Sequence, residues 1–144
     1  MPTAKGICLV GLVTILSAAG CALSPPQPAG QFTSNITLDE AADMLHSQAQ
    51  KCWRRDATTF KNGVLIDVRK PSADIRQVTA TRFGRQIGLQ KTFLTVDIKR
   101  SATGVIVDVA EGEYECEIGL GCYKMEFAPD VPRWLAGDLS CKSK

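Results

Sequence analysis

The six cysteines are the residues of this chain best suited to chemistry. Two of them belong to an apolar stretch at the N-terminus, Cys8 within it and Cys21 directly after it. The other four lie in the body of the chain: Cys52, Cys116, Cys122 and Cys141. Four such thiols form disulfides in an oxidising compartment, whereas in the cytosol the same set favours metal binding or redox chemistry. The compartment therefore decides between these interpretations.

The first 21 residues have the pattern of an export signal. One charge, Lys5, precedes the uncharged stretch I-C-L-V-G-L-V-T-I-L-S-A-A, and Gly20-Cys21 follow it. A helix needs roughly 20 apolar residues to cross a hydrocarbon core of about 30 Å, so this stretch is too short. A charged start, a short apolar middle and small residues at the end are typical of signal peptides. We expect cleavage between Gly20 and Cys21.

The residues Ala18-Ala19-Gly20-Cys21 resemble the lipobox of bacterial membrane lipoproteins. The resemblance covers residues 1–21 only, and Ala18 stands where the family usually has Leu. It implies that Cys21 carries diacylglycerol on its thiol and an acyl chain such as palmitate on its amine, with no other cofactor. Two or three chains anchor durably, whereas one anchors marginally. The alternative is an ordinary signal peptide cut at the same residues.

The residue after Cys21 is Ala22, and not the Asp that commonly retains lipoproteins of Gram-negative cells in the inner membrane. The resemblance therefore implies a protein of the cell envelope, on the outer membrane and facing the periplasm if the cell is Gram-negative. The next residues, 22–35, contain three prolines and few groups to bury, which predicts a semi-extended tether of about 3 Å per residue. We expect a signal peptide over 1–20, a lipidated N-terminus and Pro-rich tether over 21–36, and a small α+β domain over 37–144.

A helix is predicted to open that domain. Thr37-Leu38-Asp39-Glu40 is a capping-box sequence, in which the Thr hydroxyl and the Glu carboxylate each accept a free backbone N–H. Apolar residues then recur at helical spacing as far as Cys52 and Trp53, so one side of a four-turn helix is apolar. Cys52 lies on that apolar side.

Beyond the helix the pattern alternates with a period of two. Asn62-Gly63 is a strong two-residue hairpin signal. Strands are predicted over 74–83, 92–98 and 105–109, with a turn at 101–104 between the last two. Near the C-terminus, Pro132, Trp134 and Leu135 predict a short helical segment closed by Gly137. The predicted fold class is α+β: an N-terminal amphipathic helix packed on a four- to five-stranded antiparallel meander, with a short C-terminal helical segment and disulfide staples.

Four cysteines allow three pairings, and the spacing alone does not choose between them. We prefer Cys116–Cys122, which enclose two glycines, together with Cys52–Cys141. The second bridge closes a loop long enough to contribute roughly 4 to 5 kcal/mol in the chain-entropy model. Metal and redox chemistry are disfavoured, because Cys-x5-Cys is not the close pair of a zinc knuckle and no Cys-x-x-Cys is present. We predict no metal site.

Other candidate groups have ordinary interpretations. His46, the single histidine, lies one turn after Asp43, but no activated nucleophile accompanies it, so we predict no catalytic residue. Four glutamates alternate along one predicted strand: Glu111, Glu113, Glu115 and Glu117. Alternate side chains lie about 7 Å apart, which is too far for one calcium ion without help from a loop, so a solvated face is preferred.

Basic residues outnumber acidic ones in the middle of the chain. They are Arg69, Lys70, Arg76, Arg82, Arg85, Lys91, Lys99 and Arg100. Pairing with acids on neighbouring strands is the preferred interpretation, and a basic face for anionic lipids or an acidic partner is the alternative. The net charge of the whole chain is only +2, so nucleic acid is not an expected partner.

These observations lead to three functional hypotheses. The preferred one is a membrane-anchored envelope lipoprotein whose domain is a non-catalytic interaction or structural module, with the membrane and an envelope protein as partners. The second is a periplasmic inhibitor or ligand-binding lipoprotein, because Tyr114-Glu115-Cys116 resembles a short motif of lysozyme-inhibitor lipoproteins. The third is a small envelope hydrolase, for which no convincing set of residues is found. We therefore expect no enzymatic activity.

Overall fold

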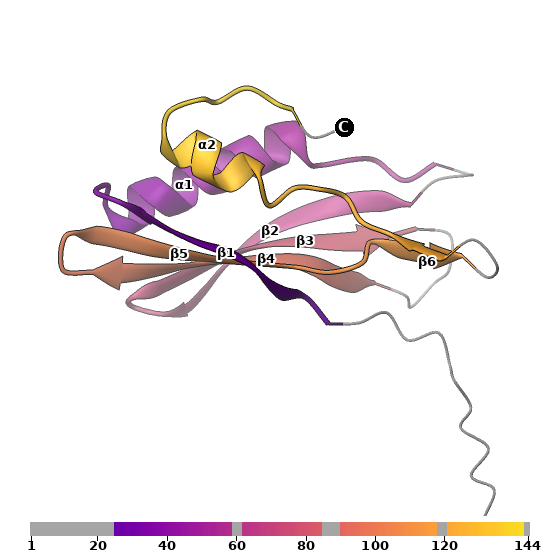
Figure 1. Cartoon of the computed structure of the whole chain (residues 1–144), viewed down its shortest axis with the longest axis horizontal. Coiled ribbons are helices and arrows are strands. Elements are labelled where there is room, and N and C mark those ends of the chain that lie inside the picture. Colours follow the sequence, from indigo (N-terminus) through magenta and orange to yellow (C-terminus); the bar gives the residue numbers. More distant parts are fainter. Residues whose placement is uncertain (1–24, 59–61, 85–89, 118–120, 143–144) are drawn as a thin grey trace, which may run out of the picture.

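The protein folds in two layers, with a five-stranded antiparallel sheet below and two helices above it (Figure 1). The computed structural model describes residues 25–58, 62–84, 90–117 and 121–142, with the backbone alone for 115–117 and 121–123. The elements in chain order are β1 (Gln27–Ser34), α1 (Leu38–Cys52), β2 (Gly63–Ser72), β3 (Ile75–Phe83), β4 (Lys91–Ser101), β5 (Gly104–Glu111), β6 (Glu115–Glu117), β7 (Gly121–Tyr123) and α2 (Asp130–Leu135). The strand order of the main sheet is β1-β5-β4-β3-β2, and β6 and β7 form a separate ribbon.

Helix α1 begins as its sequence predicts. The Thr37 hydroxyl accepts the backbone N–H of Glu40 at 3.3 Å, and the Glu40 carboxylate accepts the backbone N–H of Thr37 at 2.9 Å. These bonds satisfy two of the donors that a helix start leaves unpaired. The apolar side of α1 lies on the sheet, where Leu38, Leu45 and the alanines between them are buried. The predicted helix, with its cap and its buried side, is confirmed.

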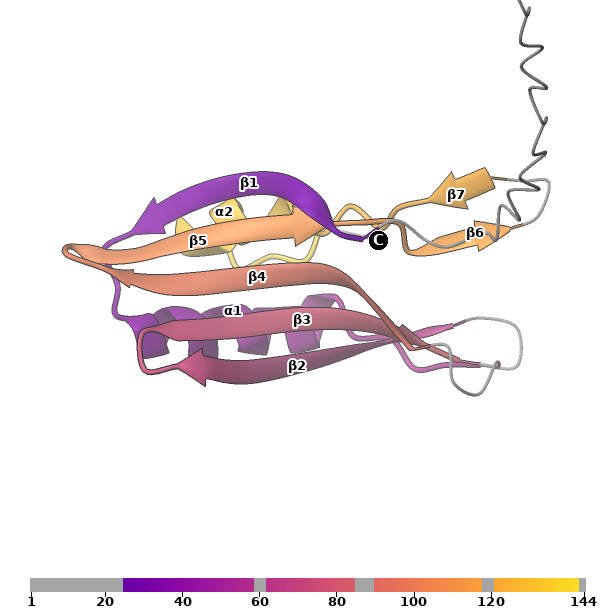
Figure 2. The same ribbon diagram turned by 90° about the horizontal axis from the view of Figure 1, so that it is seen from below.

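The sheet buries one face only. Side chains that alternate along β2, β3, β4 and β5 point to the helices and form the core, among them Ile66, Val78, Val96 and Val107. The residues between them lie on the opposite face, which both views show without a covering helix (Figures 1 and 2). One apolar and one polar face per strand is what the period of two predicts. The predicted turn at 101–104 joins β4 to β5, as expected.

The predicted fold class, an N-terminal helix packed on a meander, is wrong. The described part of the chain is mainly a five-stranded antiparallel sheet with two short helices, and its first element is the strand β1. Residues 27–34, expected to be part of a tether, pair antiparallel with β5, with Phe32 opposite Val107. The prolines did not prevent this, because β1 is an edge strand and Pro28 lies at an irregularity of its register, where a missing N–H is tolerated.

Two local predictions are also wrong. Asn62-Gly63 is not a two-residue hairpin turn, because Gly63 already pairs with Phe83 as the first residue of β2. Arg55 forms a bridge with Val64, which closes a longer loop. The glutamates from 111 to 117 do not share one strand either, since β5 ends at Glu111 and β6 begins at Glu115. The predicted C-terminal helical segment is present as α2, and Gly137 follows it with a φ of +91°.

Gly104 is the first residue of β5, directly after the β4–β5 turn. A substitution at this position tests how closely the end of β1 packs against the turn. The φ of Gly104 is +144°, and a Cβ at this position would collide with the carbonyl oxygen of Ser34 at the end of β1. Gly104→Ala is therefore expected to lower the free energy of unfolding by about 2 to 4 kcal/mol, from backbone strain plus the clash. Chemical denaturation of the purified protein measures the change.

Gly137→Ala is the matched control, because Gly137 also has a positive φ but a Cβ there would meet nothing within 4 Å. Strain alone should lower its unfolding free energy by about 1 kcal/mol. Equal losses for the two variants would contradict the contact between the turn and β1.

Candidate functional site

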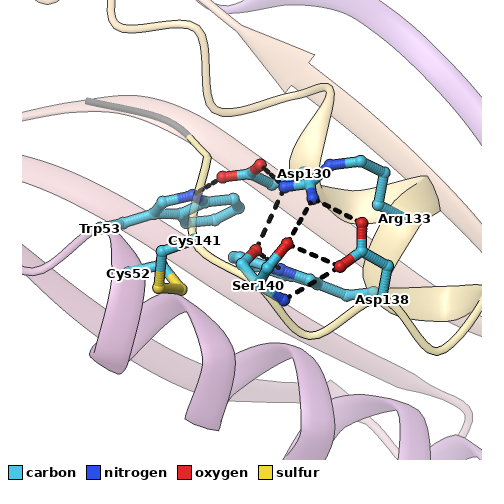
Figure 3. Close-up of a disulfide and its surroundings, with 8 residues drawn as sticks. Cys52, Trp53, Asp130, Arg133, Asp138, Ser140 and Cys141 are labelled. Atoms are coloured by element: carbon cyan, nitrogen blue, oxygen red, sulfur yellow. Dashed lines mark hydrogen bonds and ion pairs between the residues drawn. A yellow bond between two sulfur atoms is a disulfide. The ribbon is translucent and has the colours of Figure 1, made fainter.

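A polar network fastens the C-terminal segment to the end of α1 (Figure 3). We call it the C-terminal clasp, and it consists of Cys52, Trp53, Asp130, Arg133, Asp138, Ser140 and Cys141. Its covalent part is the Cys52–Cys141 disulfide, whose residues are 89 positions apart and whose Cα atoms lie 5.2 Å apart. This is the bridge that the sequence analysis preferred. Cys52 is buried at the end of α1, whereas Cys141 is exposed.

Asp130 is the buried charge of the clasp, with 2% of its surface exposed. The indole N–H of Trp53 donates to its Oδ2 at 2.9 Å, and the Arg133 guanidinium forms an ion pair with its Oδ1. A buried carboxylate without partners would be costly, so these two donors are what allow α2 to begin inside the core. The Asp130–Arg133 pair spans less than one helical turn of α2, whereas Trp53 directly follows α1 and is 77 positions away in the sequence.

Arg133 extends the network to the last residues. Its Nη1 donates to the Asp138 carboxylate at 2.9 Å and to the Ser140 hydroxyl at 3.2 Å. Asp138 also accepts the Ser140 hydroxyl at 2.6 Å and the Ser140 backbone N–H at 3.2 Å. The Ser140 bonds and the Arg133 bond hold the pKa of Asp138 well below its usual range, and the Asp130 bond raises the pKa of Arg133.

Four buried aromatic rings pack against one another next to the clasp. The Trp53 ring stacks on Phe127 at 5.0 Å between centroids and contacts Trp134 at 4.8 Å. Phe127 in turn contacts Phe93 of β4 at 5.8 Å. All four rings are buried, and aromatic pairs of this kind contribute about 0.5 to 1.5 kcal/mol beyond their burial. The indole of Trp53 thus joins the polar clasp to the apolar core.

Glu111 has a structural position that its sequence does not predict. It lies at the end of β5, and its Oε1 accepts the backbone N–H groups of Phe127 at 2.8 Å and of Ala128 at 3.4 Å. Burial raises the pKa of this carboxyl, against the lowering effect of the two N–H donors. Glu111 therefore holds the chain that enters α2, instead of belonging to an exposed acidic row.

The open face of the sheet carries cross-strand polar pairs. Asp108 of β5 accepts Lys99 Nζ at 2.8 Å and Gln31 Nε2 at 2.5 Å, which lowers the pKa of Asp108. Asp97 lies directly opposite Asp108 and accepts Gln77 Nε2 at 2.7 Å. The two facing aspartates therefore each have a donor of their own.

For three of the basic residues in the middle of the chain, the ion-pair partners are described. Arg76 reaches Asp39 of α1 at 2.9 Å, Lys99 reaches Asp108, and Arg100 reaches Asp74 at 3.0 Å. Arg76 is nearly buried, and its guanidinium also donates to three backbone carbonyl groups around the β2–β3 turn. Of these three, the Lys99–Asp108 pair joins neighbouring strands as the preferred interpretation expects, whereas Arg76 pairs with a residue of α1 and Arg100 with a residue of the β2–β3 turn. Arg69 and Lys70 are exposed on β2, and Arg85 lies outside the described residues.

His46 and Tyr114 have structural contacts. The Nε2 atom of His46 lies 3.3 Å from Gln50 Nε2, and Asp43 is exposed one turn earlier. Tyr114 is buried, packs edge-on against Phe93 and donates its hydroxyl to the Asn62 carbonyl at 3.0 Å. The tyrosine of the inhibitor-like motif is therefore part of the core and does not form an exposed recognition loop.

Several predicted residues fall outside what can be described. The signal peptide, the cleavage site at Gly20 and the lipid attachment residue Cys21 all lie before residue 25. The backbone of β6 and β7 places Cys116 directly opposite Cys122, but their side chains are not described, so that bridge stays a prediction. Within the described ranges, no three His, Cys, Asp or Glu residues gather as metal ligands, and no helix is long and apolar enough to cross a membrane.

The arrangement defines a small domain that is mainly a five-stranded antiparallel sheet, whose apolar face is covered by two short helices and whose C-terminal segment is fastened by a disulfide clasp. A scan against protein-family models finds no match, and searches of curated proteins and of solved structures find none either.

Sequence reasoning missed the polar part of the clasp, whereas its disulfide was the preferred pairing. The Asp130 and Arg133 spacing of three is visible in the sequence and is typical of an ion pair on a helix. The third member, Trp53, is 77 positions from Asp130 in the sequence. The two side chains meet only because of the way α1 and α2 lie on the sheet.

Asp130→Asn tests the buried charge of the clasp. It leaves Arg133 without its main partner and weakens the acceptor for the Trp53 indole, so the free energy of unfolding should fall by about 3 kcal/mol. Urea denaturation monitored by tryptophan fluorescence measures it. Asp74→Asn is the control: its ion pair with Arg100 is exposed, and the loss should stay under about 1 kcal/mol. Similar losses in the two variants would contradict the role of Asp130.

Glu111→Gln tests the raised pKa. An acid whose pKa is higher in the folded state than in the unfolded state stabilises the fold most when protonated, and loses that contribution as pH rises through the folded pKa. The unfolding free energy of the native protein minus that of Glu111→Gln should therefore increase from about pH 7 to about pH 4. Asp43→Asn, at an exposed position on α1, supplies the background profile. A difference that is flat or decreases toward low pH would contradict the burial of Glu111.

Proposed function

We propose that this protein is a lipoprotein of the bacterial cell envelope, anchored through lipid on Cys21. In a Gram-negative cell it lies on the outer membrane and faces the periplasm. Its domain acts as a non-catalytic interaction or structural module. The membrane and an envelope protein are its partners, and nucleic acid is not.

The observation that carries this proposal is the Cys52–Cys141 disulfide. One of its sulfur atoms belongs to an exposed residue, so reducing agents of the cytosol would have access to it. Disulfides of this kind persist in oxidising compartments such as the periplasm and the cell surface. The bridge therefore supports export, in agreement with the signal-peptide pattern that ends at Cys21.

The position of β1 supports a short connection between anchor and domain. β1 begins at Gln27, so five residues separate it from Cys21. A fully extended chain advances by at most about 3.3 to 3.6 Å per residue, which gives a reach of about 20 Å. The domain is thus held close to the bilayer. This short reach replaces the longer tether over 21–36 that the prolines predicted.

The distribution of polar groups supports an interaction module. The charged side chains of the clasp bind one another and close the fold, and Glu111 holds the backbone before α2. The open face of the sheet carries donors and acceptors in cross-strand pairs. Such a polar sheet face suits contact with another envelope protein.

Cys21→Ser tests the anchor. In full-length protein produced in a bacterial host, we expect the native chain in the membrane fraction, with an intact mass that begins at Cys21 and includes attached lipid. Cys21→Ser should lose the lipid mass and leave the membrane fraction, because a serine hydroxyl cannot form the thioether that attaches diacylglycerol. Cys8→Ser is the control and should behave like the native protein, since Cys8 is removed with the signal. A native chain of bare peptide mass would overturn the proposal.

A further inference from the structure

Strand β2 is an edge of the main sheet, opposite the β1 edge (Figure 2). Its inner side pairs with β3 from Gly63 to Ser72. On its outer side, Val64 exchanges both backbone hydrogen bonds with Arg55, at 2.9 and 3.1 Å. Among the described residues, no strand pairs with the outer side of β2 beyond Val64.

The direction of the β2 backbone groups follows from two contacts. Val64 bonds outward to Arg55, and the carbonyl of Ile66 accepts Gln50 Nε2 of α1 at 2.9 Å, also away from β3. In an antiparallel ladder, alternate residues direct their N–H and C=O groups to the same side. The backbone groups of Val68 therefore also point outward. Apart from the Ile66 carbonyl, which already accepts Gln50, the segment from Ile66 to Arg69 is open to a further strand, and beyond Arg69 the pairing with β3 is irregular.

The side chains of this segment favour a partner. The described residues include three exposed large hydrophobic side chains, and two of them are on β2: Leu65, 41% exposed, and Val68, 39% exposed. Natural sheets usually protect an open edge with charges, proline or irregular pairing. On β2 the charged residues Asp67 and Arg69 lie within the open segment, and Lys70, Pro71 and an irregular register follow it.

We propose that the occupant of this edge is a second copy of the same chain, whose β2 pairs antiparallel with β2 about Val68. The sheet would then continue through a two-fold symmetric contact, in which the same surface is used by both copies. The inference goes beyond the proposed function and depends on β2 alone, so it can fail while the lipid anchor stands.

Charge and backbone direction together select this register. With Val68 opposite Val68 of the second copy, two residues whose backbone N–H and C=O groups point outward face each other. Asp67 of each copy then lies opposite Arg69 of the other. A shift that centres the pairing on Asp67 places two aspartates opposite each other, and a shift to Arg69 places two arginines opposite each other. Opposite charges across a strand pair stabilise it and like charges destabilise it. A further shift toward the start of β2 would meet Val64, whose outward groups are already bonded to Arg55.

The pairing is compatible with membrane anchoring. The two-fold axis of antiparallel strands is perpendicular to the sheet, so both copies have their helices on the same side. When both sheets lie parallel to a bilayer, the N-terminal segments of the two copies can attach to that same bilayer. Confinement to one membrane raises the effective concentration of each copy for the other, which favours a contact of modest size.

Val68→Cys tests the register directly in the full-length protein. The Cα atoms of a hydrogen-bonded antiparallel pair lie about 5.5 Å apart, within the range that a disulfide spans. In the oxidised protein we expect a covalent dimer of twice the intact mass that reduction separates. Thr103→Cys, in the exposed β4–β5 turn, is the control and should stay monomeric.

Charge variants in the Val68→Cys background test the opposed pair. Asp67→Arg alone places like charges opposite each other twice, and the cross-linked fraction should fall about tenfold. The double variant Asp67→Arg, Arg69→Asp exchanges the charges and should restore it. Both side chains are exposed, so the fold should tolerate the changes.

A variant without an added thiol makes the test independent of oxidation. Val68→Pro removes an N–H that points away from β3, and proline is tolerated at such edge positions. In detergent, sedimentation should show a dimer for the native chain and a monomer for Val68→Pro. The proposal is overturned if Val68→Cys stays monomeric, cross-links to a different protein or cross-links no better than Thr103→Cys. Failure of the double variant to restore the dimer overturns it as well. Each measurement can be made on membrane or soluble fractions. A failure of the lipid anchor is therefore distinguished from a failure of the dimer.

Discussion

The apolar face of the five-stranded sheet is wider than one helix can cover, and the rest of the structure depends on how it is closed. The 15-residue helix α1 lies on the side of β2, β3 and β4. The remaining part, toward β5 and β1, is covered by α2, which has only six residues (Figure 2). A helix this short is not stable on its own in water, because its nucleation is not offset by enough hydrogen bonds. It must be held by contacts from elsewhere in the domain.

Those contacts come from the start and the end of α2 and from the core below it. Glu111 holds the chain that enters the helix, Asp130 binds Trp53 and Arg133 at its first turn, and Trp134 packs on Trp53. The segment that follows returns through Arg133, Asp138 and Ser140 to the disulfide. Each carboxylate of this path has at least two donors. The carboxylates of this path therefore have partners although the layer is largely apolar. The Cys52–Cys141 disulfide links the end of α1 to the C-terminal segment covalently.

The two edges of the sheet differ in how they are protected. β1 contains Pro28 and an irregular register, and it follows directly from the N-terminal segment. β2 has regular pairing over most of its length, two exposed apolar side chains, and a bridge to Arg55 only at its start. β2 also carries Asp67 and Arg69, whose charges complement each other when two copies pair antiparallel. This self-complementary charge is why we propose β2, and not β1, as the surface for a partner of the same sequence.

Local sequence determined the elements whose stabilising contacts are close in the chain. The capping box and the apolar side of α1, the alternation of β3, β4 and β5, the turn at 101–104 and the short α2 all follow from spacings of two to four residues. The preferred Cys52–Cys141 pairing was also accessible, since Cys52 lies on the apolar side of α1. The tertiary structure alone decided that residues 27–34 form a strand, that Asn62-Gly63 is not a turn, and that Glu111 and Asp130 bind the ends of segments far away. These features depend on partners tens of residues distant, and the energy of a cross-strand ladder or a buried ion pair is absent until both partners have been brought together.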